Sequence, residues 1–156
     1  MEYALKVIGL DDLSPPEAER FRREARIAAS LRHPHIVRVF DAGTTENWLY
    51  YAMAHIEGSD LSAYAARQPL SPSRAASIVC QVASAMAYLH ANDILHRDLK
   101  PANVLIREED DAPLLTDFGL ALETDRSQRL TLSSAILGTP AYMSPEQAAG
   151  RTHQIG

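Results

Sequence analysis

The feature that most constrains how this chain folds is a cluster of charged and amide side chains in its second half. Residues 96–103 read His-Arg-Asp-Leu-Lys-Pro-Ala-Asn, and Asp117-Phe118-Gly119 follows a short interval later. Asp98 can orient an attacking hydroxyl, while the side-chain oxygens of Asn103 and Asp117 are hard ligands of the kind that Mg²⁺ prefers. This combination indicates a site for phosphoryl transfer.

Two short apolar runs lie inside this cluster and predict a pair of strands. They cover residues 104–106 and 114–116, and an acidic stretch, 107–113, lies between them. The acidic stretch predicts a solvated turn, with a charge patch for a partner as the alternative. Such a pair of strands would bring Asn103 and Asp117 to adjacent strand ends.

Four motifs together resemble the eukaryotic-like serine/threonine protein kinases, with a bacterial branch favoured. Besides the two motifs above, Tyr3-Ala4-Leu5-Lys6 is similar to the lysine-bearing strand of the family. Residues 138–146, Gly-Thr-Pro-Ala-Tyr-Met-Ser-Pro-Glu, are similar to the end of its activation segment, with Ser-Pro-Glu in place of Ala-Pro-Glu. The motifs occur in the family's order and span nearly the whole chain, whereas one three-residue motif would be weak support.

The resemblance implies an α+β, protein-kinase-like bilobal fold that is partial at both ends. The family's Gly-rich phosphate loop precedes the lysine strand, yet only five residues stand before Lys6. The chain also stops ten residues after Glu146, where further helices of the large lobe are expected. We therefore expect a partial small lobe over residues 1–53, a hinge over 54–58 and a partial large lobe over 59–156.

Composition limits the class of protein and its partners. With 156 residues, 46% of them hydrophobic, the chain is long enough for one ordinary core. A net charge of −5 argues against nonspecific binding to nucleic acid or an anionic membrane. The single cysteine, Cys80, is expected to be a small core residue in a reducing compartment. No apolar run could span a bilayer and no signal region starts the chain, so this stretch is expected to be cytoplasmic.

An ion pair is expected between the first strand and the helix that follows it. Residues 3–8 are apolar and short, as in a buried strand, and Ser14-Pro15-Pro16-Glu17 predicts the start of a helix that runs to about Leu31. Glu24 lies on or beside the apolar face of this helix, formed by Phe21, Ala25, Ala28 and Leu31. Because an unpaired buried charge is costly, Lys6 is its expected partner; the alternative is a solvent-facing Glu24.

The middle of the chain predicts a β-hairpin and a second helix. His33-Pro34-His35 closes the first helix, and the strands 36–40 and 48–53 are joined by the turn-rich segment 43–47. A metal site at the two histidines is the weaker interpretation, because no companion ligands stand at metal spacing, and a structural role is favoured. Ser71-Pro72 then begins a helix whose apolar stripe indicates packing: Ala75, Ile78, Val79, Val82, Met86 and Leu89.

The resemblance implies catalytic roles for Asp98 and Lys100 in the catalytic loop, residues 96–103. Asp98 accepts or orients the proton of the substrate hydroxyl, and Lys100 offsets charge that develops on the transferred phosphoryl group. The form Asp-Leu-Lys-Pro, together with Gly138-Thr139-Pro140, is similar to serine/threonine kinases. The implied substrate is therefore a protein with a serine or threonine acceptor.

The resemblance also implies ATP and Mg²⁺ as cofactors. Asn103 and Asp117 hold the metal, while Lys6, held by Glu24, contacts the α and β phosphates. The family's gatekeeper and the hinge that meets adenine through its backbone align with Met53, Ala54, His55 and Ile56.

Control by phosphorylation is a further implication. In the family, the arginine that precedes the catalytic aspartate, here Arg97, captures a phosphate on the activation segment. The candidate acceptors are Thr131, Ser133 and Ser134, although each is equally well an ordinary loop hydroxyl. Thr139 is expected to hydrogen-bond toward Asp98 and Lys100 instead.

Three functions are compatible with these motifs. The leading one is an ATP-dependent protein kinase, although the chain alone is expected to be weak or inactive because the phosphate loop is missing. The second is a noncatalytic nucleotide-binding or regulatory module that pairs with a kinase-like partner, against which the intact Lys6, Asp98 and Asp117 argue. The third is a small-molecule phosphotransferase, which would have no evident use for a peptide-positioning segment at 138–146.

Overall fold

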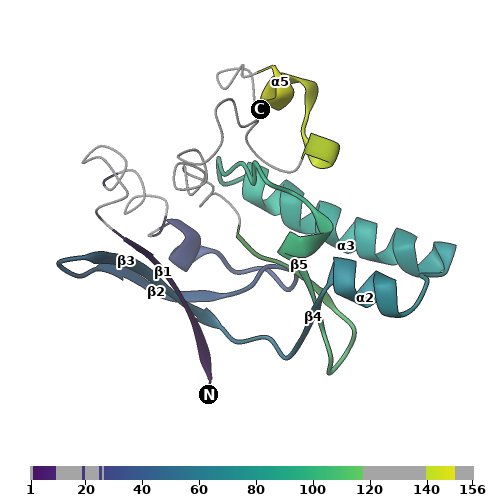
Figure 1. Ribbon diagram of the computed structural model, residues 1–156, viewed down its shortest axis with the longest axis horizontal. Helices are drawn as coiled ribbons and strands as arrows, with labels where there is room; N and C mark the ends of the chain where they lie inside the picture. Colours follow the sequence, from purple (N-terminus) through teal and green to yellow (C-terminus); the bar gives the residue numbers. More distant parts are fainter. Residues whose placement is uncertain (1, 10–18, 20–24, 26, 118–139, 150–156) are drawn as a thin grey trace.

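The computed structural model describes residues 2–9, 19, 25, 27–117 and 140–149. Figure 1 shows the elements in chain order: β1 (Tyr3–Gly9), β2 (Val39–Thr44), β3 (Trp48–Ala54), β4 (Gly58–Asp60), α2 (Leu61–Arg67), α3 (Pro72–His90), β5 (Val104–Arg107), β6 (Pro113–Leu115) and α5 (Pro145–Ala148). Two short 3-10 turns, Pro101–Asn103 and Pro140–Tyr142, precede β5 and α5 respectively. The elements form two three-stranded sheets, with α2 and α3 beside the second.

The first sheet has the order β1-β3-β2, and both strand pairs are antiparallel. The predicted hairpin exists, but its first strand is displaced: β2 runs from Val39 to Thr44, beyond the predicted range 36–40. Gly43, which favoured a turn, instead pairs with Tyr50 within the ladder. The Tyr50 side chain lies against it, so that a Cβ atom at this position would be 2.6 Å from the Tyr50 hydroxyl. The turn therefore begins at Thr45, whose backbone N–H donates to the Trp48 carbonyl at 2.8 Å.

The second sheet has the order β4-β5-β6 and confirms the predicted strand pair. Its turn is the acidic stretch, where the Arg107 guanidinium donates two hydrogen bonds, of 2.8 and 2.7 Å, to Asp110. These bonds lower the pKa of the Asp110 carboxyl to about 2. The next acid, Asp111, accepts hydrogen bonds from Tyr64 of α2 and Arg74 of α3, so the turn is tied to both helices.

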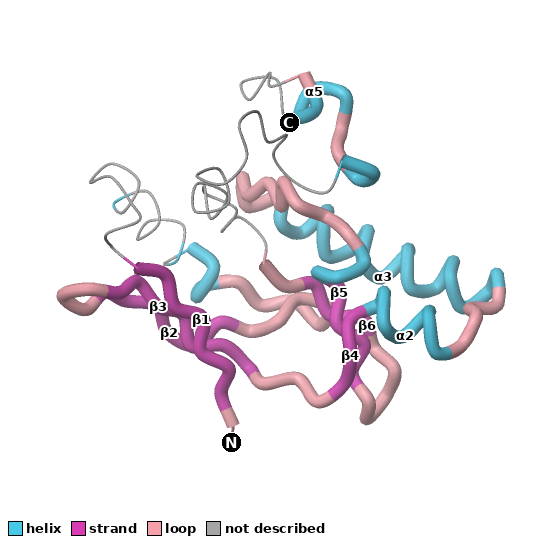
Figure 2. The backbone as a smooth tube through the Cα atoms, viewed as in Figure 1, coloured by secondary structure: helices cyan, strands magenta, loops and turns pink. Residues whose placement is uncertain are grey.

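The segment 35–38 joins the two sheets. The Val37 N–H donates to the Leu115 carbonyl at 2.9 Å, and the Leu115 N–H donates to the His35 carbonyl at 2.9 Å. On the other side, the Ala54 N–H donates to the Arg38 carbonyl at 2.8 Å. Residues 36 and 37, predicted to belong to the hairpin, are therefore a bridge to β6, and the tube in Figure 2 shows this stretch as a loop between the sheets.

Helix α3 begins as predicted and packs on β6. The Ser71 hydroxyl caps it by accepting a hydrogen bond from the Arg74 N–H at 3.2 Å, and Pro72 opens its first turn. Two expectations for this helix are wrong, because Val79 is 65% exposed and Cys80 is also exposed. A helix turns by about 100° per residue, so these two positions point away when Ile78 points inward.

One apolar cluster joins α3 to both sheets. It contains buried residues of the first sheet, the second sheet and the helices: Ala25, Ala28, Leu31, Ile36, Val39, Leu49, Tyr51, Ile78, Ala85, Leu89, Val104, Ile106 and Leu115. Three members of the predicted stripe of the first helix are thus in the core, whereas Phe21 and Glu24 lie outside the described residues. In the described part of the chain, no helix is long and apolar enough to cross a membrane.

The two neighbouring histidines make structural contacts. The His33 ring lies 5.2 Å from that of Tyr88, and its Nδ1 atom accepts a hydrogen bond from the His35 N–H at 3.2 Å. The His35 Nδ1–H donates to the Pro113 carbonyl at 3.0 Å. These contacts support the structural interpretation, and no group of three potential His, Cys, Asp or Glu ligands occurs among the residues that the structure describes.

Candidate functional site

The carboxylate of Asp98 is held from two sides within the loop that follows α3. The Asn103 amide donates to the Asp98 side chain at 3.0 Å and to the Asp98 backbone carbonyl at 2.7 Å. The Lys100 ammonium lies 2.7 Å from the same carboxylate oxygen. Because two donors converge on one oxygen, the orientation of the Asp98 carboxylate is set before any substrate arrives.

The local sequence explains how Asn103 comes back to Asp98. Lys100 is extended, and Pro101 then begins a 3-10 turn in which the Asn103 N–H donates to the Lys100 carbonyl at 2.9 Å. Proline suits this position because its fixed φ matches the turn and its missing N–H is not needed there. The turn ends at Asn103, which is buried, and β5 starts at the next residue.

His96 connects this loop to the residue before Asp117. Its Nε2–H donates to the Thr116 carbonyl at 3.0 Å, and its Nδ1 faces the Asp98 N–H at 3.4 Å. The ring is buried, and burial lowers its pKa below the ordinary value of 6.5. A neutral ring with the proton on Nε2 satisfies both neighbours. Sequence analysis had assigned His96 no role beyond its place in the motif.

Lys6 and Asp117 meet at the junction of the two sheets. The Lys6 ammonium lies 2.5 Å from Asp117 Oδ1, and both side chains are about one-third exposed. Pairing of β5 with β6 continues beyond the strands, because the Thr116 N–H donates to the Asn103 carbonyl at 3.0 Å. Asn103 and Asp117 therefore stand at adjacent strand ends, and Lys6 reaches Asp117 from β1.

The donor set at this junction fits a magnesium ion. Mg²⁺ keeps several waters and is usually held by one or two protein carboxylates together with substrate phosphates. Asn103 and Asp117 supply one amide and one carboxylate from neighbouring positions. The Asp117 carboxylate already attracts a positive charge, because it pairs with the Lys6 ammonium. The chemistry of these groups therefore suits a metal that is bound together with a nucleotide.

Several predicted residues lie at the edges of this site or outside the described part. Ala54 ends β3 and Ile56 follows it, both partly buried. Arg97 is exposed and has a φ of 64°, in the left-handed region that costs a non-glycine residue about 1–3 kcal/mol. The remaining predictions concern residues outside the described ranges, namely Glu24 and its pairing with Lys6, Thr131, Ser133, Ser134 and Thr139.

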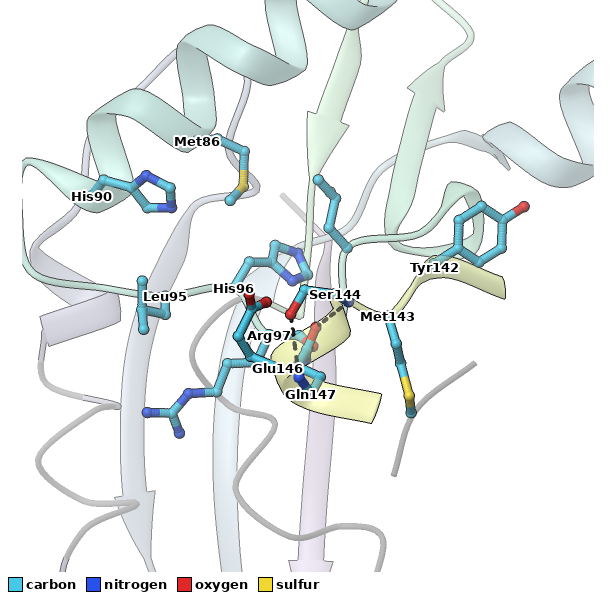
Figure 3. A pocket seen from close by; sticks show the side chains of 11 residues that line it. Met86, His90, Leu95, His96, Arg97, Tyr142, Met143, Ser144, Glu146 and Gln147 are labelled. Carbon is cyan, nitrogen blue, oxygen red and sulfur yellow. Dashed lines mark hydrogen bonds between the residues drawn. The ribbon is translucent and has the colours of Figure 1, made fainter. Parts of the chain in front are cut away.

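Sequence analysis missed a hydrogen bond between the backbone of Arg97 and helix α5. The Gln147 amide, in α5, donates to the Arg97 carbonyl at 2.5 Å. Figure 3 shows both residues beside a pocket of about 420 Å³ between the end of α3, the loop around His96 and the residues before and within α5. The only hint in the sequence was the spacing Ser144 to Gln147, which is that of a capping box.

Comparison with known families finds one family whose model matches nearly the whole chain. A family model described as the protein kinase domain matches residues 1–155. Among curated relatives, the serine/threonine-protein kinase PrkC of Bacillus subtilis is 42% identical over 151 residues, which are 96% of this chain and 23% of PrkC. The serine/threonine-protein kinase PkaA of Streptomyces coelicolor is 45% identical over 135 residues, 85% of this chain and 25% of PkaA.

Solved structures agree with the sequence relatives. The crystal structure of the Mycobacterium tuberculosis PknI kinase domain superposes with a TM-score of 0.73 and 36% sequence identity. The match covers 95% of this chain and 55% of the PknI chain. The chain therefore spans about half of a solved kinase domain and about a quarter of the curated relatives it matches, and the partial bilobal α+β fold is confirmed.

Proposed function

Because the chain belongs to the protein kinase family, we propose that it is part of an ATP-dependent serine/threonine protein kinase and contains the residues that carry the chemistry. The observation that carries this proposal is the contact between Lys6 and Asp117, 2.5 Å long, next to the Asp98–Asn103 pair. It joins groups from two sheets in the combination that phosphoryl transfer needs. Serine or threonine as the acceptor is supported by the relatives PrkC and PkaA, both of which are serine/threonine-protein kinases.

In the proposed reaction, a substrate hydroxyl oxygen forms a bond to the γ-phosphorus of ATP. The bond from that phosphorus to the oxygen bridging to the β-phosphate breaks, and ADP leaves. The hydroxyl proton passes to the Asp98 carboxylate, which Asn103 and Lys100 orient through contacts of 3.0 and 2.7 Å. The Lys100 ammonium also stands where it can offset negative charge on the transferred group.

The nucleotide would be held by residues of both sheets. Asn103 and Asp117 would hold Mg²⁺, which neutralises phosphate charge when it is bound. Lys6 would exchange its partner, from the Asp117 carboxylate to the α and β phosphates. Since the Ala54 N–H already donates to Arg38, Ala54 would offer its carbonyl to adenine, and Ile56 its backbone.

Regulation by phosphorylation belongs to the same proposal. Arg97 precedes Asp98 directly and is exposed, so its guanidinium is open to a phosphate group. The proposed acceptors are Thr131, Ser133 and Ser134, while Thr139 would contact Asp98 and Lys100. The distinguishing measurement is the stoichiometry of phosphate on each of these hydroxyls after incubation with an active kinase.

The test of the proposed function is a thermal melt of the 156-residue chain with and without Mg²⁺ and ATP, beside Asp117→Asn. We expect ATP with Mg²⁺ to raise the melting temperature of the parent chain, because ligands that bind only the folded state stabilise it. Asp117→Asn should abolish the effect, since it replaces a charged metal ligand with a neutral amide. A cooperative melt of the parent chain that does not respond to ATP with Mg²⁺ would contradict nucleotide binding by this chain.

An activity assay separates the proposed function from its main alternative. The natural protein that contains these residues is incubated with labelled ATP and a protein substrate rich in serine and threonine, with Asp98→Asn as the matched control. Label on serine or threonine that disappears in Asp98→Asn supports the kinase. Nucleotide-dependent stabilisation without any transfer would favour the noncatalytic nucleotide-binding module, which could act through a kinase-like dimer partner.

A further inference from the structure

We propose that Gln147 is a positioning residue for Asp98, which couples helix α5 to the catalytic loop by holding the Arg97 carbonyl. The proposal rests on the proposed function, because Asp98 is its target. It concerns a residue that the four motifs do not contain. The contact joins two segments that are 50 residues apart in sequence.

The Gln147 side chain uses both ends of its amide. Its Oε1 accepts a hydrogen bond from the Ser144 N–H at 3.1 Å, and its Nε2 donates to the Arg97 carbonyl at 2.5 Å. The Ser144 hydroxyl in turn accepts from the Gln147 N–H at 3.3 Å, which completes a capping box around the start of α5. The cap fixes where the amide stands, so its free donor is aimed at Arg97 (Figure 3).

The Arg97 carbonyl is an effective point at which to hold Asp98. This carbonyl and the Asp98 N–H belong to one planar peptide unit, so fixing the oxygen also fixes the direction of the N–H. On the other side, the same N–H donates to the His96 carbonyl at 2.9 Å. Arg97 lies in the left-handed region with a φ of 64°, a conformation that persists only where its surroundings enforce it. Gln147 and His96 enforce it from opposite ends of the peptide.

The capping box provides a matched pair of variants. In Gln147→Glu the new carboxylate still accepts from the Ser144 N–H, since either residue completes a capping box, but it cannot donate to Arg97. In Ser144→Ala the cap hydroxyl is lost, whereas the Gln147 donor remains. The first variant thus removes the link to the catalytic loop, and the second weakens only α5.

The experiment measures hydrogen exchange at the Asp98 amide in the parent chain and both variants. It also measures the kinetics of protein phosphorylation in the natural protein that contains these residues, with and without the same two substitutions. We expect Gln147→Glu to raise the Asp98 exchange rate by about fivefold, because its peptide unit loses one anchor. We also expect it to lower kcat by about tenfold, with KM for ATP within about twofold of the parent value. Ser144→Ala should leave the exchange rate and kcat within about twofold of the parent values.

Two results would overturn the proposal. One is an Asp98 exchange rate in Gln147→Glu that equals that of the parent chain. The other is an equal rise in both variants, which would assign the effect to α5 as a whole. If the natural protein that contains these residues transfers no phosphate, the proposed function fails, while the exchange rates in the 156-residue chain still decide whether Gln147 positions Asp98.

Discussion

Lys6 forms an ion pair with Asp117 in this structure. The two charges lie 2.5 Å apart, although Lys6 in β1 and Asp117, two residues after β6, are 111 positions apart in sequence. The expected pairing with Glu24 lies outside the described residues and stays a prediction. A divalent metal and the Lys6 ammonium would compete for one carboxylate. In the proposed function, the nucleotide phosphates would therefore have two tasks, because they would bind the metal and draw Lys6 away from Asp117.

Lys6→Met should strengthen metal binding in the absence of nucleotide. Methionine keeps the length and apolar character of the stem but removes the ammonium that faces Asp117. Since the pair is about one-third exposed, its contribution is about 1 kcal/mol or less, and we expect the affinity for Mn²⁺ alone to rise by up to about fivefold. The measurement is the free Mn²⁺ signal in electron paramagnetic resonance.

Two control measurements accompany this prediction. Asp117→Asn should weaken Mn²⁺ binding, because it removes the ligand itself. Lys6→Met should also lose the stabilisation by ATP with Mg²⁺, because no ammonium is left for the phosphates. Weaker Mn²⁺ binding in Lys6→Met than in the parent chain would show that Lys6 supports the metal site in place of competing with it.

At the scale of elements, local signals located the start of α3 more accurately than its buried face. Ser71 and Pro72 specify the beginning of α3 through contacts within four residues, and the structure agrees. Apolar identity alone did not reveal which side of the helix is covered, because Val79 is as apolar as its buried neighbour. The β2 strand shows the same limit, since Gly43 signals a turn locally and lies under Tyr50 in the folded chain.

Ile78→Ala and Val79→Ala should separate these two faces of α3. Ile78 is 2% exposed, and its truncation should leave a cavity that costs about 2–5 kcal/mol of unfolding free energy. Val79 is 65% exposed, and its truncation should change that free energy by about 0.5 kcal/mol or less. Urea unfolding followed by circular dichroism measures both. Equal losses in the two variants would mean that the Val79 side chain is covered in solution.

For the whole molecule, two histidines should make stability depend on pH. Burial lowers the pKa of His96 below 6.5. The pKa of His33 is also lowered below 6.5, mainly by burial and to a smaller extent by repulsion from His35. The unfolded chain therefore binds protons near pH 6.5 that the folded chain excludes. Stability is fully present above about pH 6.5 and falls below it, by at most about 1.4 kcal/mol per pH unit for each histidine.

Urea unfolding at about pH 7.5 and about pH 5.5 checks this prediction. The parent chain should have the lower midpoint in the more acidic buffer. His96→Gln should be less stable at both values but should show a smaller difference between them, because one titrating group is gone. A midpoint that does not change with pH in the parent chain would contradict a neutral, buried His96.

The sequence by itself determined the chemistry of the site and most of its local scaffold. Asp98, Lys100 and Asn103 lie within one short loop, and the pairing of β5 with β6 brings Asp117 beside it, so local patterns sufficed to predict this convergence. Helix caps and strand periodicity likewise depend on neighbours in the chain. The family resemblance supplied the roles that such patterns leave open.

Only the tertiary structure decided which distant groups meet. The contact of Lys6 with Asp117 and that of Gln147 with Arg97 join residues 111 and 50 positions apart. The bridge from segment 35–38 to β6 is another such pairing. No local period or cap encodes these contacts, because each depends on how two separately formed elements pack, and packing is selected by the burial of the shared apolar core.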